Sequence, residues 1–256
     1  MQALDYKFFM THKLIIIIVT IVLYGCESFG APDVYTGVWE GLGKATLPDN
    51  SEYNGHFVNG LFDGKGTMIW KDGDKYTGYF RFGLFSGYGE FYFRDGSYHK
   101  GNYKDGMASG KGVFLDKKGK KYEGDHLENY WDGFGILISP EFGRYEGEFR
   151  KGKYHGNGIF YFKNGDVYNG KFKAGLWSGK GSLTLHGGKK YIGDFLNGQY
   201  HGNGIFSDSN GDVYKGEFFD GMRHGKGICI NDNTIASCNY NYGEQTTYEE
   251  IPNSEI

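Results

Sequence analysis

The sequence predicts an all-β protein, an elongated single antiparallel sheet made of stacked β-hairpin repeats of 23 residues. Three observations support this fold class. Glycine contributes 45 of the 256 residues, aromatic residues make up 18% of the chain, and one spacing of glycine and aromatic residues returns every 23 positions. Each glycine inside a helix costs about 1 kcal/mol relative to alanine, so the composition argues against long helices. It also argues against disorder, because disordered chains contain few aromatic residues.

Residues 1–25 predict a signal peptide for export. The apolar run over residues 14–24 is about half of the roughly 20 apolar residues that span a bilayer, which is the length of a signal-peptide core. The stretch that begins at Met10 reads as a complete signal by itself. Either Met1 or Met10 could therefore start the chain.

The signal ends in Leu23-Tyr24-Gly25-Cys26, which resembles the lipobox of bacterial lipoproteins. Tyr24 departs from that pattern because it is bulkier than the residue usual at its place. The resemblance implies cleavage before Cys26 and attachment of lipid to this cysteine. It also implies export to a bacterial membrane, with the chain on the periplasmic side or at the cell surface. A plain secretory signal that is cleaved without lipid, or a short membrane anchor, are the alternatives.

Residues 26–52 predict a linker and a partial first repeat, and residues 53–236 hold eight full repeats. We number the positions of a repeat from Tyr53, which is position zero. This position is Tyr in all repeats but one, position four is aromatic or His, and Gly-x-Gly fills positions eleven to thirteen. Position two is always glycine: Gly55, Gly78, Gly101, Gly124, Gly147, Gly170, Gly193 and Gly216.

The alternation aromatic-x-Gly-x-aromatic places all three residues on one face of a strand. The second strand adds an apolar residue at position fifteen, such as Met68. A two-residue turn would place Met68 opposite Thr77 and separate the two apolar rows. A three-residue turn ending in Gly places Met68 opposite Tyr76 and unites them, and we expect this turn because burial decides register. Position seven is Gly in every repeat but one, where Asn129 is the non-glycine residue best suited to positive φ.

The pattern Tyr-x-Gly-x-Phe-x-x-Gly-x-x-x-Gly-x-Gly resembles the MORN repeat, the membrane occupation and recognition nexus. The resemblance covers about residues 35–242. It implies an antiparallel sheet that serves in scaffolding, in partner binding or in membrane association.

No catalytic, cofactor-binding or metal-binding residues stand out, so the sequence predicts a protein that is not an enzyme and uses no cofactor. The Gly-Lys-Gly sequences, such as that at Lys111, lack the spacing and the Ser or Thr of a phosphate-binding loop. His155, His201 and His224 share position ten, but successive repeats lie about 10 Å apart. A shared zinc would need its ligands about 2 Å from the metal. The net charge of -3 gives no reason to expect nucleic acid.

Residues 237–256 predict a degenerate cap and a disordered tail, because the tail from Gly243 is acidic and polar. Cys229 and Cys238 would face opposite sides of the sheet in the expected register. The turn between them contains no glycine, however, and a slip by one residue would bring them face to face. A disulfide between the two cysteines and a pair of free thiols both stay open.

Position nine predicts an edge that binds partners. We place this position in the hairpin loop, where polar residues are usual, yet six of eight repeats have an aromatic residue there. These residues are Phe62, Phe85, Trp131, Tyr154, Trp177 and Tyr200. Stacked loops would present them at intervals of about 10 Å, and an apolar edge often marks an interaction site. The alternative is that the rings fold back and cap the apolar row.

The sequence thus predicts a non-catalytic MORN-repeat scaffold. We expect an envelope or surface lipoprotein, tethered to the membrane through lipid on Cys26 and bound to an unknown protein partner. The alternative is a module that binds lipid headgroups or the membrane surface. The lysine-rich hairpin tip at residues 117–121 would favour such contact, because basic residues near a membrane contribute about 1 kcal/mol each. A turn that is simply exposed to solvent is the alternative for this tip, and the favoured one.

Overall fold

The computed structural model describes residues 40–232 and 234–252, and the regular structure in these two stretches is β-strand throughout. The predicted signal peptide, Cys26 and the beginning of the partial repeat lie outside the described residues. Within the described part of the chain, no helix is long and apolar enough to cross a membrane. The chain forms two compact units, with the boundary between Ile138 and Ser139.

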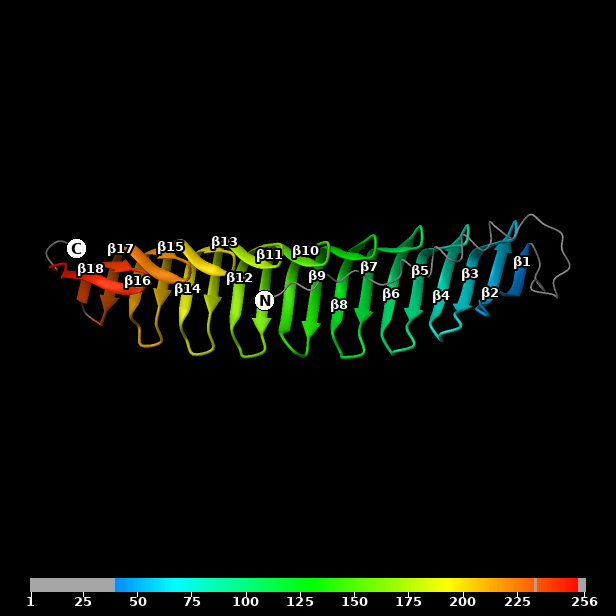
Figure 1. Cartoon of the computed structure of the whole chain (residues 1–256), viewed down its shortest axis with the longest axis horizontal. Helices are drawn as coiled ribbons and strands as arrows, with labels where there is room; N and C mark the ends of the chain where they lie inside the picture. Colours follow the sequence, from blue (N-terminus) through cyan, green and yellow to red (C-terminus); the bar gives the residue numbers. More distant parts are fainter. Residues whose placement is uncertain (1–39, 233, 253–256) are drawn as a thin grey trace. The chain divides into compact units, whose positions relative to one another are not determined.

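In each unit the strands follow one another as antiparallel hairpins in chain order (Figure 1). The first unit holds β1 (Gly41–Thr46), β2 (Glu52–Val58), β3 (Leu61–Ile69), β4 (Lys75–Arg81), β5 (Leu84–Tyr92), β6 (Tyr98–Lys104), β7 (Met107–Leu115), β8 (Lys121–Leu127) and β9 (Tyr130–Ser139), which ends at the boundary. The second unit holds β10 (Gly143–Arg150), β11 (Lys153–Phe162), β12 (Val167–Lys173), β13 (Leu176–Thr184), β14 (Lys190–Leu196), β15 (Gln199–Ser207), β16 (Val213–Phe219), β17 (Met222–Asn231), β18 (Thr234–Asn241) and β19 (Glu244–Glu250). This arrangement confirms the predicted all-β fold of stacked 23-residue hairpins.

The turn between the two strands of one repeat has only two residues. Between β2 and β3 these are Asn59 and Gly60, with φ angles of 49° and 75°. Positive φ at both residues defines the type I′ turn, whose twist matches that of the strands it joins. The φ of Asn129 is 68°, as its residue type predicted. Its side chain accepts a hydrogen bond from the backbone N–H of Ala108 (2.8 Å), which ties its hairpin to the preceding one.

The turn between successive repeats has three residues, as the sequence predicted. Between β3 and β4 the N–H of Trp70 donates a hydrogen bond to the carbonyl of Asp74 (2.9 Å), which leaves residues 71–73 as the loop. The N–H of Gly73 donates a hydrogen bond to the carbonyl of Trp70 (2.9 Å). The φ of Gly73 is 93°, which is the left-handed conformation expected at the end of such a turn. Met68 therefore lies opposite Tyr76, and the predicted register is confirmed.

The first glycine of each Gly-x-Gly lies in a β-bulge. Gly55 lies opposite Gly66, but Phe57 lies opposite Phe62, so β3 has two more residues than β2 over this stretch. Gly64 is among the extra residues and has a φ of 81°, which suits glycine best. Because the excess is two residues, side chains before and after the bulge keep to the same face of the sheet.

A tyrosine ring covers the two glycines that face each other across neighbouring strands. A Cβ built on Gly55 or Gly66 would collide with the phenol ring of Tyr53. The hydroxyl of Tyr53 donates a hydrogen bond to the carbonyl of His56 (2.9 Å). The equivalent bond, from position zero to the carbonyl of position three, recurs at Tyr76, Tyr122, Tyr145, Tyr168, Tyr191 and Tyr214.

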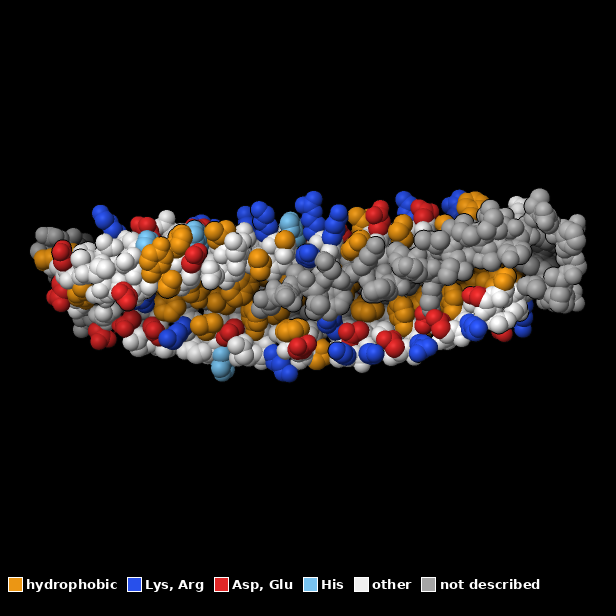
Figure 2. All heavy atoms as spheres, viewed as in Figure 1, with side chains coloured by type: hydrophobic (Ala, Val, Ile, Leu, Met, Phe, Trp, Pro, Cys, Tyr) orange, Lys and Arg blue, Asp and Glu red, His pale blue; other side chains and the backbone are white. Residues whose placement is uncertain are grey.

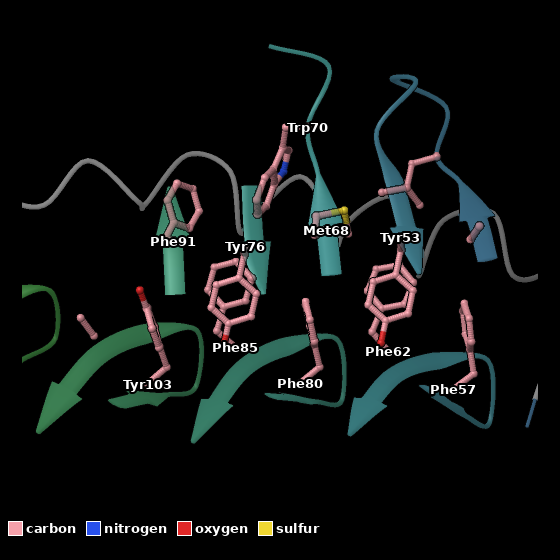
Figure 3. Packing of buried hydrophobic residues seen from close by; sticks show 13 residues of the cluster. Tyr53, Phe57, Phe62, Met68, Trp70, Tyr76, Phe80, Phe85, Phe91 and Tyr103 are labelled. Carbon is pink, nitrogen blue, oxygen red and sulfur yellow. The ribbon is translucent and has the colours of Figure 1, made fainter. Parts of the chain in front are cut away.

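Further aromatic rings hold each tyrosine in place and form the core (Figure 3). Tyr53 stacks on Phe62, with ring centroids 3.8 Å apart. Phe57 and Phe80 pack edge-on against it, at 5.2 and 5.1 Å. All four rings are buried. Because Phe80 belongs to the next repeat, Tyr53 joins two neighbouring hairpins. Equivalent edge-on contacts with a ring of the next repeat are made by Tyr76, Tyr145, Tyr168 and Tyr191.

The C-terminal stretch is more regular than the sequence suggested. Tyr242 and Gly243 form a further two-residue turn, and β19 pairs with β18. The expectation of a disordered tail is therefore wrong for residues 244–250. The acidic composition was misleading because every side chain of β19 is exposed, so polar residues do not prevent its backbone from pairing.

The glycine pairs should tolerate no side chain, and Gly170 in the second unit offers a clean test. A Cβ on Gly170 would lie 2.6 Å from the Cα of Gly181 and 2.6 Å from the Tyr168 hydroxyl. We expect Gly170→Ala to lower the free energy of unfolding by about 1–3 kcal/mol, the usual cost of overpacking. Gly187→Ala is the matched control, since its Cβ would meet nothing within 4 Å. Urea unfolding of both variants measures the difference, and equal stability would contradict the packing described above.

Candidate interaction surfaces

The position-nine rings lie in strands and not in loops. Because the preceding turn takes only two residues, β3 begins at Leu61, and Phe62 already pairs with Phe57. Phe62, Phe85 and Trp131 are buried. Their predicted placement on an exposed loop edge is wrong, and they instead close over the apolar row of the first unit.

In the second unit, the position-nine residues Tyr154, Trp177 and Tyr200 are half-buried. Each lies against the tyrosine at position zero of its repeat, with ring centroids 4.2, 4.5 and 4.0 Å apart. Figure 2 shows a band of hydrophobic side chains over this unit, with charged side chains along both edges. These three rings therefore serve the core and keep part of their surface available for contact.

Cys229 and Cys238 form a disulfide in the structure. Asn231 pairs with Thr234, so the turn between β17 and β18 has two residues instead of three. Cys229 consequently lies opposite Ala236, one residue away from the partner that the regular turn would give. The slip by one residue that the glycine-free turn allowed brings the two cysteines to the same face.

The first unit carries a groove on the face opposite its buried rings, and we call it the outer groove. It crosses the strands β5 to β9, and the backbone of Gly101, Gly112 and Gly124 forms its floor. One wall consists of Tyr88, Asn102, Lys111 and Phe134; the other consists of Tyr98, Lys100, Val113, Lys121, Glu123 and Ile136. Its volume is about 740 Å³, a size typical of ligand sites.

The walls of the outer groove expose large aromatic side chains. Tyr88 and Phe134 are 53% and 51% exposed, although both belong to regular strands. Tyr79 and Tyr92 are further exposed rings on the same face. Exposed apolar surface of this kind, bordered by polar residues, is typical of interaction sites.

The lysines of the outer groove lie beside acidic groups. Lys111 Nζ is 2.8 Å from a carboxylate oxygen of Asp125, and Lys121 Nζ is 2.9 Å from one of Glu123. Lys100 Nζ is 3.1 Å from a carboxylate oxygen of Glu90. Each of these ammonium groups has three N–H donors, so an ion pair leaves donors for a ligand.

The second unit has an equivalent groove with different chemistry. The backbone of Gly170, Gly181, Gly193, Gly204 and Gly216 forms the floor, and the volume is about 800 Å³. Its walls are Asn169, Lys180, Ser182, Ile192, Asn203, Ile205 and Lys215. Among the described residues, no aromatic side chain lines this groove, so the outer groove of the first unit is the better candidate for binding through ring contacts.

The two-residue turns present a second type of surface, which we call the turn edge. Several apolar side chains in or next to these turns are well exposed. In the first unit they are Phe82 and Leu127, and in the second unit they are Leu176, Leu196, Phe219 and Met222. Basic residues lie among them, at Arg81, Lys104, Arg150, Lys151 and Lys173. Apolar side chains mixed with cations can contact an anionic membrane surface.

A buried pair of histidines interrupts the core below the outer groove. His99 replaces tyrosine at position zero, and His126 replaces phenylalanine at position four of the next repeat. Their ring centroids are 4.8 Å apart, and His99 Nδ1 lies 2.6 Å from the hydroxyl of Tyr103. Burial lowers the pKa of His99 to about 3, with a smaller effect of His126, and burial lowers the pKa of His126 to about 4. Both rings are therefore neutral at pH 7.

The described stretches hold no group of three or more His, Cys, Asp and Glu side chains arranged to bind a metal ion. His155, His201 and His224 lie in separate strands, β11, β15 and β17. These three histidines therefore do not form a shared site.

A family model described as the MORN repeat matches seven segments of the chain. These are residues 53–75, 76–98, 99–121, 145–167, 168–189, 191–213 and 214–233, which together make up more than half of the sequence. The stretch over residues 122–144 is not among them. It forms the same hairpin nonetheless, with Gly124 opposite Gly135, but it has His126 at position four and Asn129 at position seven.

A search of curated proteins finds no match. Among solved structures, the wild-type TCP10 domain of Danio rerio CPAP is similar with a TM-score of 0.41 and 11% identity, over 81% of this chain and 99% of that chain. The TCP domain of Drosophila melanogaster SAS-4 (dCPAP), in complex with a proline-rich motif of Ana2, has a TM-score of 0.37 and 10% identity, over 75% of this chain and 99% of that chain. Neither likeness bears on what this chain binds.

The histidine pair should make the protein sensitive to acid. The unfolded chain takes up protons near the usual histidine pKa of about 6.5, whereas folded His126 and His99 do so only near 4 and 3. The free energy of unfolding is therefore highest above pH 6.5, where the histidines are neutral in both states. It falls as the pH drops toward 4, by up to about 1.4 kcal/mol per pH unit for each histidine.

The triple variant His99→Tyr, Tyr103→Phe, His126→Phe restores the residue types of the other repeats and should lose much of this dependence. Urea unfolding at pH 7 and pH 5 measures it. The remaining histidines are the same in both proteins and serve as an internal control. An equal loss of stability in wild type and variant would show that the pair is not responsible.

Proposed function

The chain belongs to the MORN repeat family, and we propose that it is a non-catalytic scaffold that holds a protein partner in the outer groove of its first unit. The observation that supports this function most is the exposure of Tyr88 and Phe134 on the walls of the groove. Aromatic side chains contribute more binding energy in protein interfaces than most residue types.

The second part of the proposal concerns location. A scaffold that is exported and tethered by lipid on Cys26 would present its groove at the envelope of a bacterium, on the periplasmic side or at the surface. The motivation is the sequence Leu23-Tyr24-Gly25-Cys26 behind a short apolar run. Lipid together with a second contact gives stable membrane attachment, and the basic side chains of the turn edge could supply this contact.

A second candidate function is direct binding of a membrane surface by the turn edge. Phe82 is 64% exposed and Leu127 is 53% exposed, and Arg81 and Lys104 lie in the same unit. In this case the repeats would bind anionic vesicles without any lipid on Cys26. Flotation of a chain that lacks residues 1–26 with such vesicles separates the two functions, because only a membrane binder floats without its acyl group.

Site-specific photo-crosslinking in the producing cells tests the proposed groove. A photoreactive phenylalanine at position 134, in the groove, should give protein adducts. The same residue at position 82, on the turn edge, is the control and should give none. Protein adducts from position 82 alone would overturn the groove assignment, and lipid adducts there would favour the membrane function.

Metabolic labelling with a fatty acid tests the anchor. The wild-type chain should take up label, and Cys26→Ser should not, because acylation requires the thiol. Cys229→Ser is a control that keeps Cys26 and should be labelled like the wild type. Equal labelling of the wild type and Cys26→Ser would remove lipidation from the proposal.

A further inference from the structure

The second unit carries a row of half-buried side chains at position nine, on the side of its buried rings. The row consists of Tyr154, Trp177, Tyr200 and Arg223, which come from β11, β13, β15 and β17, and we call it the position-nine row. Its members belong to successive repeats, which are spaced at about 9.6 Å, so the row extends over roughly 29 Å. It offers three aromatic rings followed by one cation.

Arg223 takes the place of a ring in this row. Its Cζ lies 5.1 Å from the ring centroid of Tyr214, the position-zero tyrosine of its repeat. Tyr200 contacts Tyr191 in the same way, with ring centroids 4.0 Å apart. The guanidinium also lies 5.4 Å from the ring of Tyr240 in the next strand. Because a planar guanidinium can stack on rings and keep the N–H donors at its edge, the row is continuous and ends in a positive charge.

The charge of Arg223 has no carboxylate beside it. Its Nη1 donates a hydrogen bond to the hydroxyl of Tyr240 (3.1 Å), which in turn donates to Oε1 of Gln245 (3.2 Å). Among the residues that the structure describes, no Asp or Glu side chain forms an ion pair with Arg223. The lysines of the outer groove, in contrast, each lie beside a carboxylate. A guanidinium has five N–H donors, so most of those of Arg223 stay available for an anionic group.

The aromatic members of the row also offer polar groups. Within the described stretches, neither the hydroxyls of Tyr154 and Tyr200 nor the indole N–H of Trp177 form a hydrogen bond with another residue. Tyrosine and tryptophan usually pair these groups when their rings are buried. The carbonyl and N–H groups of a peptide backbone can pair with them. A fatty acyl chain has no polar group along its length and would leave all three unpaired, so the row suits a peptide better than a lipid.

We propose that the position-nine row binds an extended apolar segment of a partner protein, with one carboxylate of this segment on the guanidinium of Arg223. A carboxylate and a guanidinium form charge-assisted hydrogen bonds, which are stronger than bonds between neutral groups. An extended chain advances about 3.3 Å per residue, so roughly nine residues cover the row. The site goes beyond the scaffold function proposed above, because it lies in the second unit and shares no residue with the outer groove.

Four labelled peptides with blocked ends test the ligand chemistry by fluorescence anisotropy with the full chain. An extended chain turns alternate side chains to one side. The peptides (Leu-Ser)4-Glu and Glu-(Ser-Leu)4 therefore present leucines and one carboxylate together, in the two chain directions, whereas (Leu-Ser)4-Gln and Gln-(Ser-Leu)4 lack the charge. We expect at least one glutamate peptide to bind about tenfold more tightly than its glutamine counterpart. Equal binding within both pairs, or no binding of either glutamate peptide, overturns the proposal.

The variant Arg223→Tyr tests whether the guanidinium holds the carboxylate. Tyrosine is the residue type at this place in two other repeats, at Tyr154 and Tyr200, so the variant keeps the packing and removes the charge. It should bind glutamate and glutamine peptides equally. Lys226→Gln is the matched control, because Lys226 is an exposed cation of the same strand at the outward position twelve, and it should keep the tenfold preference. A preference that survives in Arg223→Tyr, or that is lost in Lys226→Gln, overturns the proposal.

The variant Trp177→Phe tests whether the peptide lies along the row. It keeps a ring at this place and removes the indole N–H, so we expect the glutamate peptide to bind about fivefold more weakly. Unchanged binding would show that the row only covers the core.

Laurate is the probe for the lipid alternative. Binding of laurate that depends on Arg223, without binding of either glutamate peptide, would assign the row to a lipid and overturn the proposal. None of these outcomes depends on crosslinking from position 134, so a failure of this site and a failure of the outer groove can be told apart.

Discussion

The repeat depends on one contact, a phenol ring that lies flat across two facing glycines. The ring can approach the sheet this closely only where no Cβ stands beneath it, which explains the glycines at positions two and thirteen of the repeats that begin with tyrosine. At Gly101 and Gly112 the covering ring is the imidazole of His99. Its hydroxyl must then find a partner, because an unpaired buried hydroxyl costs free energy. The carbonyl of position three supplies this partner, at 2.9 Å for Tyr53 and 3.0 Å for Tyr76. Burial also raises the pKa of Tyr76, so the phenol stays protonated and donates.

The same contact determines which positions of the repeat keep one residue type and which positions differ between repeats. Residues that face the core must fit around the tyrosine, and they are nearly the same in every repeat. Residues at position twelve face the other way and are unrestricted: Lys65, Tyr88, Lys111, Phe134, Asn157, Lys180, Asn203 and Lys226. The first unit consequently has an aromatic groove and the second a polar one, on an equivalent backbone. Binding specificity of the grooves resides in the outward positions.

Much of the fold could be predicted from the sequence because the same pattern of glycine and aromatic residues recurs in every repeat. The period, the three-residue turn and the opposition of Met68 and Tyr76 all follow from alternation and burial. The place of Phe62 was missed because a longer loop was assumed, although simple alternation puts it on the same face as Gly66 and Met68. The outer groove gave no periodic signal, because its walls differ from one repeat to the next. Only the register between strands brings Tyr88 and Phe134 into one groove.

The acid-sensitive part of the core and the outer groove share the same glycines. A Cβ on Gly112 would meet His99 and His126 on the core side, while the backbone of Gly112 forms part of the groove floor on the other side. A ligand that binds only the folded groove stabilises this floor by RT ln(1 + [L]/Kd). Protonation of the histidines favours the unfolded state of the first unit, because the folded core keeps both rings neutral. Binding and proton uptake must therefore oppose each other, and by linkage a ligand that occupies the groove also lowers the pH at which the first unit loses its stability.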